Sequence, residues 1–225
     1  MKKLLAAIIA AALLLSGCTS ASRPAESAPP TGTPSPSPTP IVTPTPAPEP
    51  SDDELVLVRD YIPGIFIDLK YATTDNFTGQ VIYDSDEAYL RYGTVKKLLA
   101  AQNELSGRGL SLKIWDAYRP VSAQFKLWEI CPNPVYVSDP NNGYSKHSRA
   151  NTVDITLVTS TGESIPMPSG FDDFTSLADR DYSDVSAEAA ENARLLESIM
   201  VENGFVPYSG EWWHYSDSVA YDVYG

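Results

Sequence analysis

The chain of 225 residues is 43% hydrophobic and 20% charged, a composition that allows one folded domain with residues to spare. Asp and Glu number 29 against 16 Lys and Arg, and the net charge of −13 argues against nucleic acid as a partner and against docking on anionic lipid, because both need clustered cations. The two cysteines lie far apart, which excludes a small scaffold held by several disulfides.

Residues 1–18 are predicted to be an export signal. Lys2 and Lys3 precede a run of 12 apolar residues, which is shorter than the roughly 20 that a membrane-spanning helix needs. The segment from Leu15 to Cys18 (LSGC) resembles a bacterial lipoprotein cleavage box, in which the cysteine becomes the lipidated first residue. An ordinary signal peptide with a chance cysteine is the alternative. We expect an exported lipoprotein, anchored through Cys18 to the outer face of the cell membrane.

Residues 19–51 are predicted to form a disordered tether. Eleven prolines lie between Pro24 and Pro50, mixed with Ser, Thr and Ala. Proline lacks an N–H and fixes φ, and few large apolar side chains are present to form a core. The segment should therefore be an extended spacer that holds a domain away from a membrane. An inert disordered tail is the alternative, and it would have the same conformation.

Short strands and helices are predicted to alternate irregularly within residues 52–225, the expected folded domain. Strands are predicted over 55–58, 65–69, 110–115, 153–158 and 211–215. Helices are predicted over 86–105, 120–130 and 186–201, the last capped by Ser186 and followed by Gly204. This order is typical of an α+β fold rather than a regular βαβ series. We expect one compact domain with a small, mainly antiparallel sheet flanked by helices.

The first of only two histidines, His147, lies in a polar loop over residues 143–149. Asp154 follows seven residues later, within a predicted apolar strand. A buried carboxylate is costly unless it is paired, so this aspartate needs a partner. A metal ion is one such partner, and a structural hydrogen bond or salt bridge is the commoner one.

The second histidine, His214, follows Glu211 by three residues in an aromatic segment. A catalytic zinc ion takes three protein ligands and a water, and a nearby carboxylate can serve as general base. Two histidines and one acid meet this count. Their spacing does not match the short helical His-Glu-x-x-His pattern, so from spacing alone ordinary hydrogen-bonded histidines remain the alternative.

Asp116 and Arg119 lie between a predicted strand and a predicted helix, in the segment from Trp115 to Pro120. Arginine carries a permanent charge and a rigid fork of donors that suits an oxyanion. A surface ion pair between Asp116 and Arg119 is the plainer interpretation of the same residues.

Four separated stretches together resemble the zinc D-alanyl-D-alanine dipeptidases of the vancomycin-resistance type. The resemblance covers about residues 55–216, nearly the whole predicted domain. Its motifs are residues 68–79 as an N-terminal signature, 115–120 as an arginine motif, Ser145-x-His147 leading to Asp154, and Glu211-Trp212-Trp213-His214.

The resemblance implies an enzyme that hydrolyses the dipeptide D-Ala-D-Ala, with one Zn²⁺ ion per chain bound at the sheet by His147, Asp154 and His214. It implies that Glu211 is the general base and that Arg119 stabilises the oxyanion of the tetrahedral intermediate. Contacts to the substrate, its amino terminus included, are implied for Tyr71, Ser145, Asp172 and Asp116.

The sequence departs from the family pattern at two positions near the first histidine. The family usually has Gly three residues after this His and Ala two residues before the Asp, and here the residues are Ala150 and Thr152. Both are small, but a shift of about 1 Å in the loop that presents His147 can cost about a hundredfold in rate. Cys131 has no partner once Cys18 carries lipid, and we expect it to be a buried or half-buried thiol rather than a nucleophile.

Two other functions remain open from the sequence. One is a D,D- or L,D-carboxypeptidase that trims peptidoglycan stem peptides, whose substrates also lie outside the membrane. The other is a non-catalytic, zinc-stabilised wall-binding module, which would keep the three ligands but would not need Glu211 or Arg119. The presence of both residues favours catalysis.

Overall fold

The computed structural model describes residues 48–225. The predicted export signal over 1–18, the lipidation at Cys18 and almost all of the predicted tether over 19–51 therefore lie outside the described residues. At the near end of the tether, Glu49 accepts a hydrogen bond of 2.5 Å from the Tyr92 hydroxyl, so contacts with the folded part begin before residue 52.

The described chain forms an α+β domain. Its elements in order are β1 (Leu55–Leu57), α1 (Val58–Tyr61), β2 (Phe66–Ile67), η1 (Lys70–Ala72), β3 (Tyr89–Arg91), α2 (Tyr92–Ser106), β4 (Leu110–Asp116), α3 (Val121–Ile130), η2 (Lys146–Arg149), β5 (Thr152–Thr159), η3 (Ser176–Ala178), α4 (Ala187–Glu202), β6 (Phe205–Tyr208) and β7 (Glu211–Asp217). Strands β1 and β3 form a two-stranded ribbon, and the main sheet has the order β2-β4-β5-β7-β6. Within this sheet only β2 and β4 pair in parallel, which confirms the predicted fold class.

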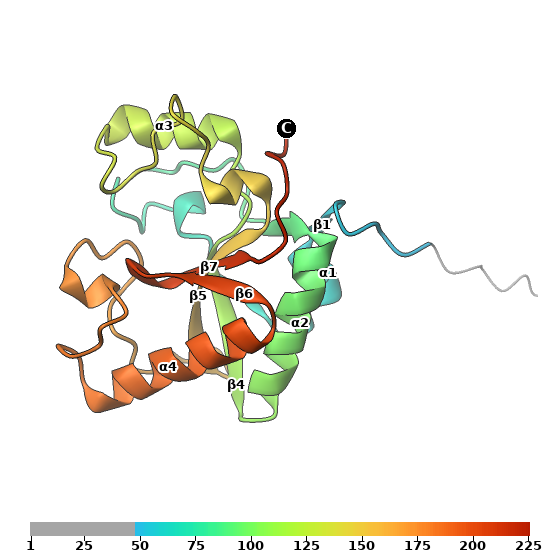
Figure 1. Cartoon of the computed structure of the whole chain (residues 1–225), viewed down its shortest axis with the longest axis vertical. Coiled ribbons are helices and arrows are strands. Elements are labelled where there is room, and N and C mark those ends of the chain that lie inside the picture. The colour runs from blue at the N-terminus through green and yellow to red at the C-terminus, as the bar shows by residue number, and fades with distance from the viewer. Residues whose placement is uncertain (1–47) are drawn as a thin grey trace, which may run out of the picture. The chain divides into compact units, whose positions relative to one another are not determined.

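Helices α2 and α4 pack against the sheet and against each other, and Figure 1 shows α3 on the far side of the molecule from α4. Their apolar side chains supply much of the core: Leu98 and Leu105 from α2 and Leu196 and Met200 from α4 are fully buried. This burial at helical spacing is what the sequence pattern of both helices encodes. The predicted cap is confirmed, because the Ser186 hydroxyl accepts a hydrogen bond from the N–H of Ala189.

The prediction of a helix from residue 86 was wrong in its first part. Helix α2 begins only at Tyr92, and the three residues before it form β3, in which Leu90 is fully buried opposite Val56 of β1. A single apolar residue such as Leu90 fits both the helical and the strand periodicity, so the spacing of apolar residues could not distinguish a helix from a strand here. Similarly, Val58 begins α1 rather than ending a strand, and Pro120 precedes α3 as its cap.

Strand β6 was not predicted. It contains Pro207, which argues against a strand in the middle of a sheet, but β6 lies at the edge of the sheet, where a missing N–H is tolerated. Strand β2 is shorter than the predicted segment 65–69 and covers only Phe66 and Ile67.

Two single features complete the description of the domain. Cys131 is half-buried, as predicted, and the other cysteine, Cys18, lies outside the described residues. None of the helices between residues 48 and 225 combines the length and apolarity needed to cross a bilayer.

Candidate metal centre

Three acidic or imidazole side chains form one row across the main sheet. Asp154 of β5 lies directly opposite His214 of β7, and Asp116 of β4 lies directly opposite Asp154. Residues that face each other across antiparallel strands point to the same side of the sheet. The strand register therefore brings Asp154 and His214 together although 60 residues separate them in sequence.

An irregularity in β4 places Asp116 in this row. The pairing of β4 with β5 shifts between Ile114 and Asp116, so Trp115 is an extra residue in the strand. With regular pairing beyond the Ile114–Ile155 pair, Trp115 would have faced Asp154. Bulges of this kind re-aim side chains and are frequent beside active sites.

His147 reaches the row from η2. The Ser145 hydroxyl caps this short helix by accepting a hydrogen bond from the N–H of His147 at 3.3 Å. The helix ends at Ala150, whose φ of 57° lies in the left-handed region. Ala150 thus adopts the conformation for which glycine is suited, at a cost of about 1–2 kcal/mol. The second departure, Thr152, is accommodated because its hydroxyl donates to the Ser216 hydroxyl at 3.1 Å.

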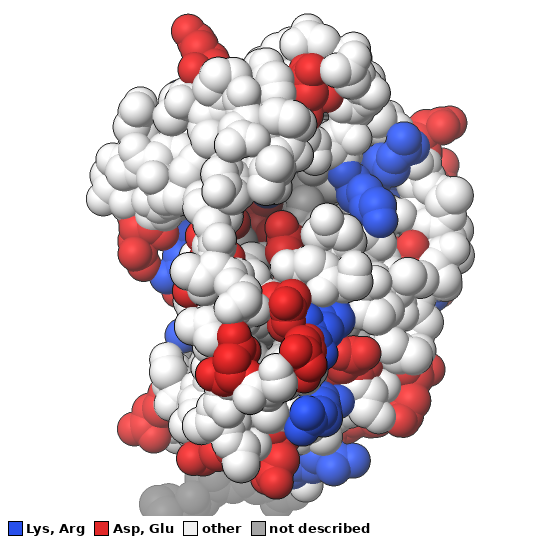
Figure 2. All heavy atoms as spheres, turned by 60° about the vertical axis from the view of Figure 1, so that its left-hand side comes forward, with Lys and Arg blue, Asp and Glu red and all other residues white. Residues whose placement is uncertain are grey.

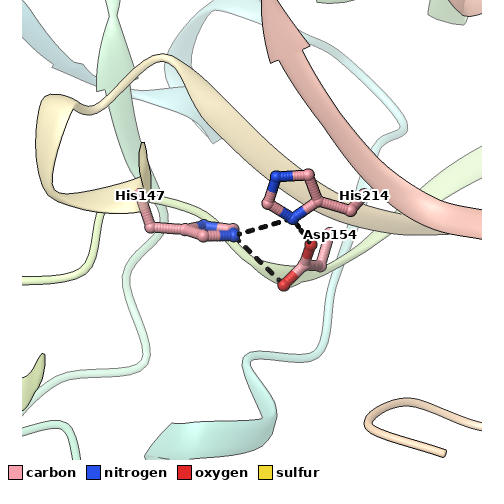
Figure 3. A group of neighbouring side chains, drawn as sticks. All are labelled: His147, Asp154 and His214. Carbon is pink, nitrogen blue, oxygen red and sulfur yellow. Dashed lines mark hydrogen bonds and ion pairs between the residues drawn. The ribbon is translucent and has the colours of Figure 1, made fainter. Parts of the chain in front are cut away.

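The two imidazoles and one carboxylate converge on a common point, as Figure 3 shows. His214 Nδ1 lies 2.9 Å from Asp154 Oδ1, and His147 Nε2 lies 3.3 Å from Asp154 Oδ2. The two histidine nitrogens are 3.4 Å apart, and one ligand atom from each of the three residues lies within 4.8 Å of the others. These three residues are the set predicted from the sequence to bind a metal.

The other ring nitrogen of His147 is held from behind. His147 Nδ1 lies 2.9 Å from the carbonyl oxygen of Ala117, and Asp116 Oδ2 lies 3.5 Å away from the same nitrogen. An N–H on Nδ1 that donates to this carbonyl leaves the lone pair of Nε2 facing Asp154 and His214. Histidines that bind metals are usually held in this way, so the donor set and its support fit a divalent cation such as zinc.

Burial, neighbouring charges and hydrogen bonds shift the pKa values of the carboxylates in and beside this row. Burial acts to raise the pKa of Asp154, but the charges and hydrogen bonds of His147 and His214 outweigh it and lower that pKa. Burial raises the pKa of Glu211 to about 8, with further increases from the charges of Asp154 and Asp172. Burial likewise raises the pKa of Asp172 to about 7. Carboxylates crowded in this manner are stabilised by a bound cation.

Glu211 stands next to the candidate ligands. It is the first residue of β7, and its Oε2 lies 3.5 Å from His214 Nδ1. Its side chain is 37% exposed, in contrast to the buried Asp154. Glu211 is therefore a partly exposed carboxylate that lies directly beside the three candidate metal ligands.

Asp116 and Arg119 form a buried pair, so the interpretation as a surface ion pair was wrong. One Asp116 oxygen accepts from Arg119 Nε at 3.1 Å and from Nη2 at 2.5 Å, and the other accepts from the Tyr83 hydroxyl at 2.5 Å. Arg119 Nη1 donates to Gln124 Oε1 at 2.9 Å. Asp116, expected among the substrate contacts, is fully buried, and in this structure its oxygens position Arg119 and Tyr83.

Tyr71 and Asp172, both expected to contact substrate, are bonded to each other. The Tyr71 hydroxyl donates to Asp172 Oδ2 at 2.7 Å across 101 residues of sequence. The Arg119 guanidinium lies 5.0 Å from the centre of the Tyr71 ring, so the arginine and the Tyr71–Asp172 pair belong to one cluster. Asp172 has a φ of 51°, a strained conformation of the kind that is frequent at functional sites.

A cavity of about 290 Å³ opens beside the candidate ligands. Its walls include Glu211, His214 and Ser145, three residues that the sequence had singled out, together with Pro134, Val135, Tyr136, Ser138, Lys146 and Tyr208. A cavity of this size holds a small molecule. Figure 2 shows one face of the molecule with acidic side chains around a hollow and basic side chains near its edge.

Several residues of the site were not predicted from the sequence. Tyr83 and Gln124 support Asp116 and Arg119, and Tyr208 lies with its ring 5.7 Å from that of His214. Gln124 lies one turn into the helix that Arg119 precedes, and its burial despite being polar is seen only in the structure. Tyr83 and Tyr208 come from segments with no motif.

Comparison with known proteins gives a consistent result. Residues 51–222 match the peptidase M15 family model, described as D-ala-D-ala dipeptidase. A D-alanyl-D-alanine dipeptidase of Escherichia coli (strain K12) is 40% identical over 162 residues, which are 72% of this chain and 83% of that protein. Proteins of the same name from Enterococcus faecium and Streptomyces coelicolor are 36% and 37% identical, over 69% and 72% of this chain and over 87% and 91% of their own lengths.

Proposed function

The chain belongs to the D-Ala-D-Ala dipeptidase family of M15 metallopeptidases, and from this premise we propose that it hydrolyses D-Ala-D-Ala to free D-alanine with one zinc ion per chain. The observation that carries the proposal is the convergence of His147, Asp154 and His214, with Glu211 beside them. Two imidazoles and one carboxylate are the kind of donor set that catalytic zinc uses.

Zinc in this position would supply Lewis-acid activation of a water molecule and of the scissile carbonyl. Among the chain's own residues, Glu211 would accept a proton from the attacking water and later give it to the leaving amine. Its partial exposure and its distance of 3.5 Å from His214 support this role. The general base must lose its proton first, and a bound cation would lower the raised pKa of Glu211 and so favour the ionised form.

Arg119 would stabilise the negative charge that develops on the carbonyl oxygen. An arginine has five N–H donors, and three nitrogens of Arg119 each give one hydrogen bond to Asp116 or Gln124. Two N–H groups are thus left for an oxyanion, while the other bonds fix the plane of the guanidinium. Donors that are already oriented in this way avoid reorganisation during the reaction.

Recognition of the substrate's amino terminus is proposed for Asp172, held by Tyr71. The Asp172 carboxylate is half-buried, and a peptide that lacks a free ammonium at the same place would leave it unpaired and be rejected. The same argument favours a dipeptidase over a carboxypeptidase, whose longer substrates carry an amide at that point.

The test is a combined metal and product assay on the full chain purified in detergent. We expect about one zinc per chain, release of D-alanine from D-Ala-D-Ala, loss of activity on chelation and recovery with added zinc. A stem pentapeptide serves as the competing substrate. Release of D-alanine from the pentapeptide alone would instead support the carboxypeptidase, and muropeptide binding without release would support a wall-binding module.

The lipid anchor is a separate proposal that rests on the sequence from Leu15 to Cys18. An exported enzyme, tethered through residues 19–51 to the outer face of the cell membrane, would meet dipeptides outside the cell. Cells that express the chain and are fed radiolabelled fatty acid should label the wild-type protein and not a Cys18→Ser variant. Equal labelling of the two, or none in the wild type, would remove the anchor from the proposal.

A further inference from the structure

Lys146 is an exposed lysine on the wall of the cavity that also contains Glu211 and His214. Its ammonium makes no hydrogen bond and no ion pair with any residue between 48 and 225. In contrast, Lys70, Lys96 and Lys97 each pair with an aspartate. Lys113 also forms no ion pair with a described residue, but it does not line this cavity, whereas Lys146 brings an uncommitted positive charge to the same wall as Glu211 and His214.

The proposed substrate carries two charges, and the residues considered so far account for only one of them. Asp172 would pair with the ammonium of D-Ala-D-Ala. The carboxylate at the other end of the dipeptide also loses water on binding, and a desolvated carboxylate needs a cation or several donors. The two N–H groups of Arg119 that its bonds to Asp116 and Gln124 leave are already assigned to the carbonyl oxygen, so the carboxylate needs a different cation.

We propose that Lys146 binds the α-carboxylate of the substrate and makes the enzyme selective for peptides that end one residue beyond the cleaved bond. This inference rests on the proposed function and deepens it. Lys146 is the residue directly before His147, within η2, and Ser145 next to it lines the same cavity. The ammonium is therefore tethered at a short range from a candidate metal ligand. The four-carbon stem of a lysine allows the charge to follow the carboxylate as it binds.

The test compares wild type, Lys146→Met and Lys146→Arg with two substrates, D-Ala-D-Ala and D-alanyl-D-alaninamide. Methionine keeps the length and removes the charge, whereas arginine keeps the charge. Losing one charge-assisted hydrogen bond should raise the KM for the free acid roughly tenfold to hundredfold and leave kcat within about threefold. The preference for the acid over the amide should fall by the same factor in Lys146→Met and be retained in Lys146→Arg.

An unchanged acid-to-amide preference in Lys146→Met, or an equal loss with both substrates, would overturn the proposal, because a merely structural role does not depend on the substrate's carboxylate. Binding of both compounds to the Glu211→Gln variant, measured by calorimetry with and without Lys146→Met, separates this inference from the proposed function. Binding of the acid that depends on Lys146, with no turnover in wild type, would reject the dipeptidase activity and retain the carboxylate site. Turnover in wild type with binding that is indifferent to Lys146 would do the reverse.

Discussion

Replacement of Glu211 by Gln is expected to lower kcat for D-Ala-D-Ala by roughly 100- to 10,000-fold, the usual contribution of a positioned general base. Gln keeps the size and the hydrogen-bonding capacity of Glu211 but cannot accept the proton. Zinc content should stay near one per chain, because the three candidate ligands are His147, Asp154 and His214. Steady-state kinetics and elemental analysis on the same preparation measure the two quantities together.

The matched control for this variant is Asp154→Asn. It alters the candidate ligand whose two carboxylate oxygens lie next to His147 and His214. Here the zinc content should fall along with activity. If Glu211→Gln kept wild-type turnover, or lost its zinc as Asp154→Asn is expected to, the role given to Glu211 would be wrong.

The second large effect is expected on stability. Asp116→Ala should lower the free energy of unfolding by about 3–5 kcal/mol, because it leaves the buried Arg119 guanidinium without its counter-charge. The Tyr83 hydroxyl and the backbone N–H of Ala117 lose their acceptor in the same step. Urea denaturation followed by tryptophan fluorescence measures the change.

An exposed ion pair provides the comparison. The pair between Asp52 and Lys96 has side chains that are 63% and 47% exposed, so Asp52→Ala should cost no more than about 1 kcal/mol. Where Asp116→Ala fails to fold, Asp116→Asn supplies the measurement, since it keeps an acceptor and removes only the charge. If the Asp116 variants lose no more free energy of unfolding than Asp52→Ala, the Asp116–Arg119 pair does not stabilise the fold as expected of a buried pair.

The candidate ligands could be predicted from the sequence through the resemblance to a known family, because spacing alone left ordinary hydrogen-bonded histidines as the alternative. Asp154 is an acid inside an apolar strand, and His214 follows Glu211 in an aromatic one, but these features do not by themselves indicate a metal. The α+β fold was predictable from local pattern, since α4 and β5 have clear apolar periods. Local pattern is sufficient where a residue's environment is set by its own element.

Features that depend on how elements meet could not be predicted. The bulge at Trp115 is a property of the pairing of β4 with β5, and nothing in the order of residues 110–116 announces it. The support of His147 by the Ala117 carbonyl involves a backbone atom, which has no residue signature. The burial of Asp116 with Arg119 was missed because the sequence at a strand end does not show which distant segments, such as that of Tyr83, cover it.

The pairing of β5 with β7 also has a practical consequence for preparing the protein. A slip of one residue between these strands would turn Asp154 away from His214. It would also move Val153 and Ile155 together to the opposite face of the sheet. Molecules with mispaired strands would thus lose the proposed zinc site and the apolar packing together. The number of high-affinity zinc equivalents taken up per chain after refolding should accordingly serve as a count of correctly assembled molecules.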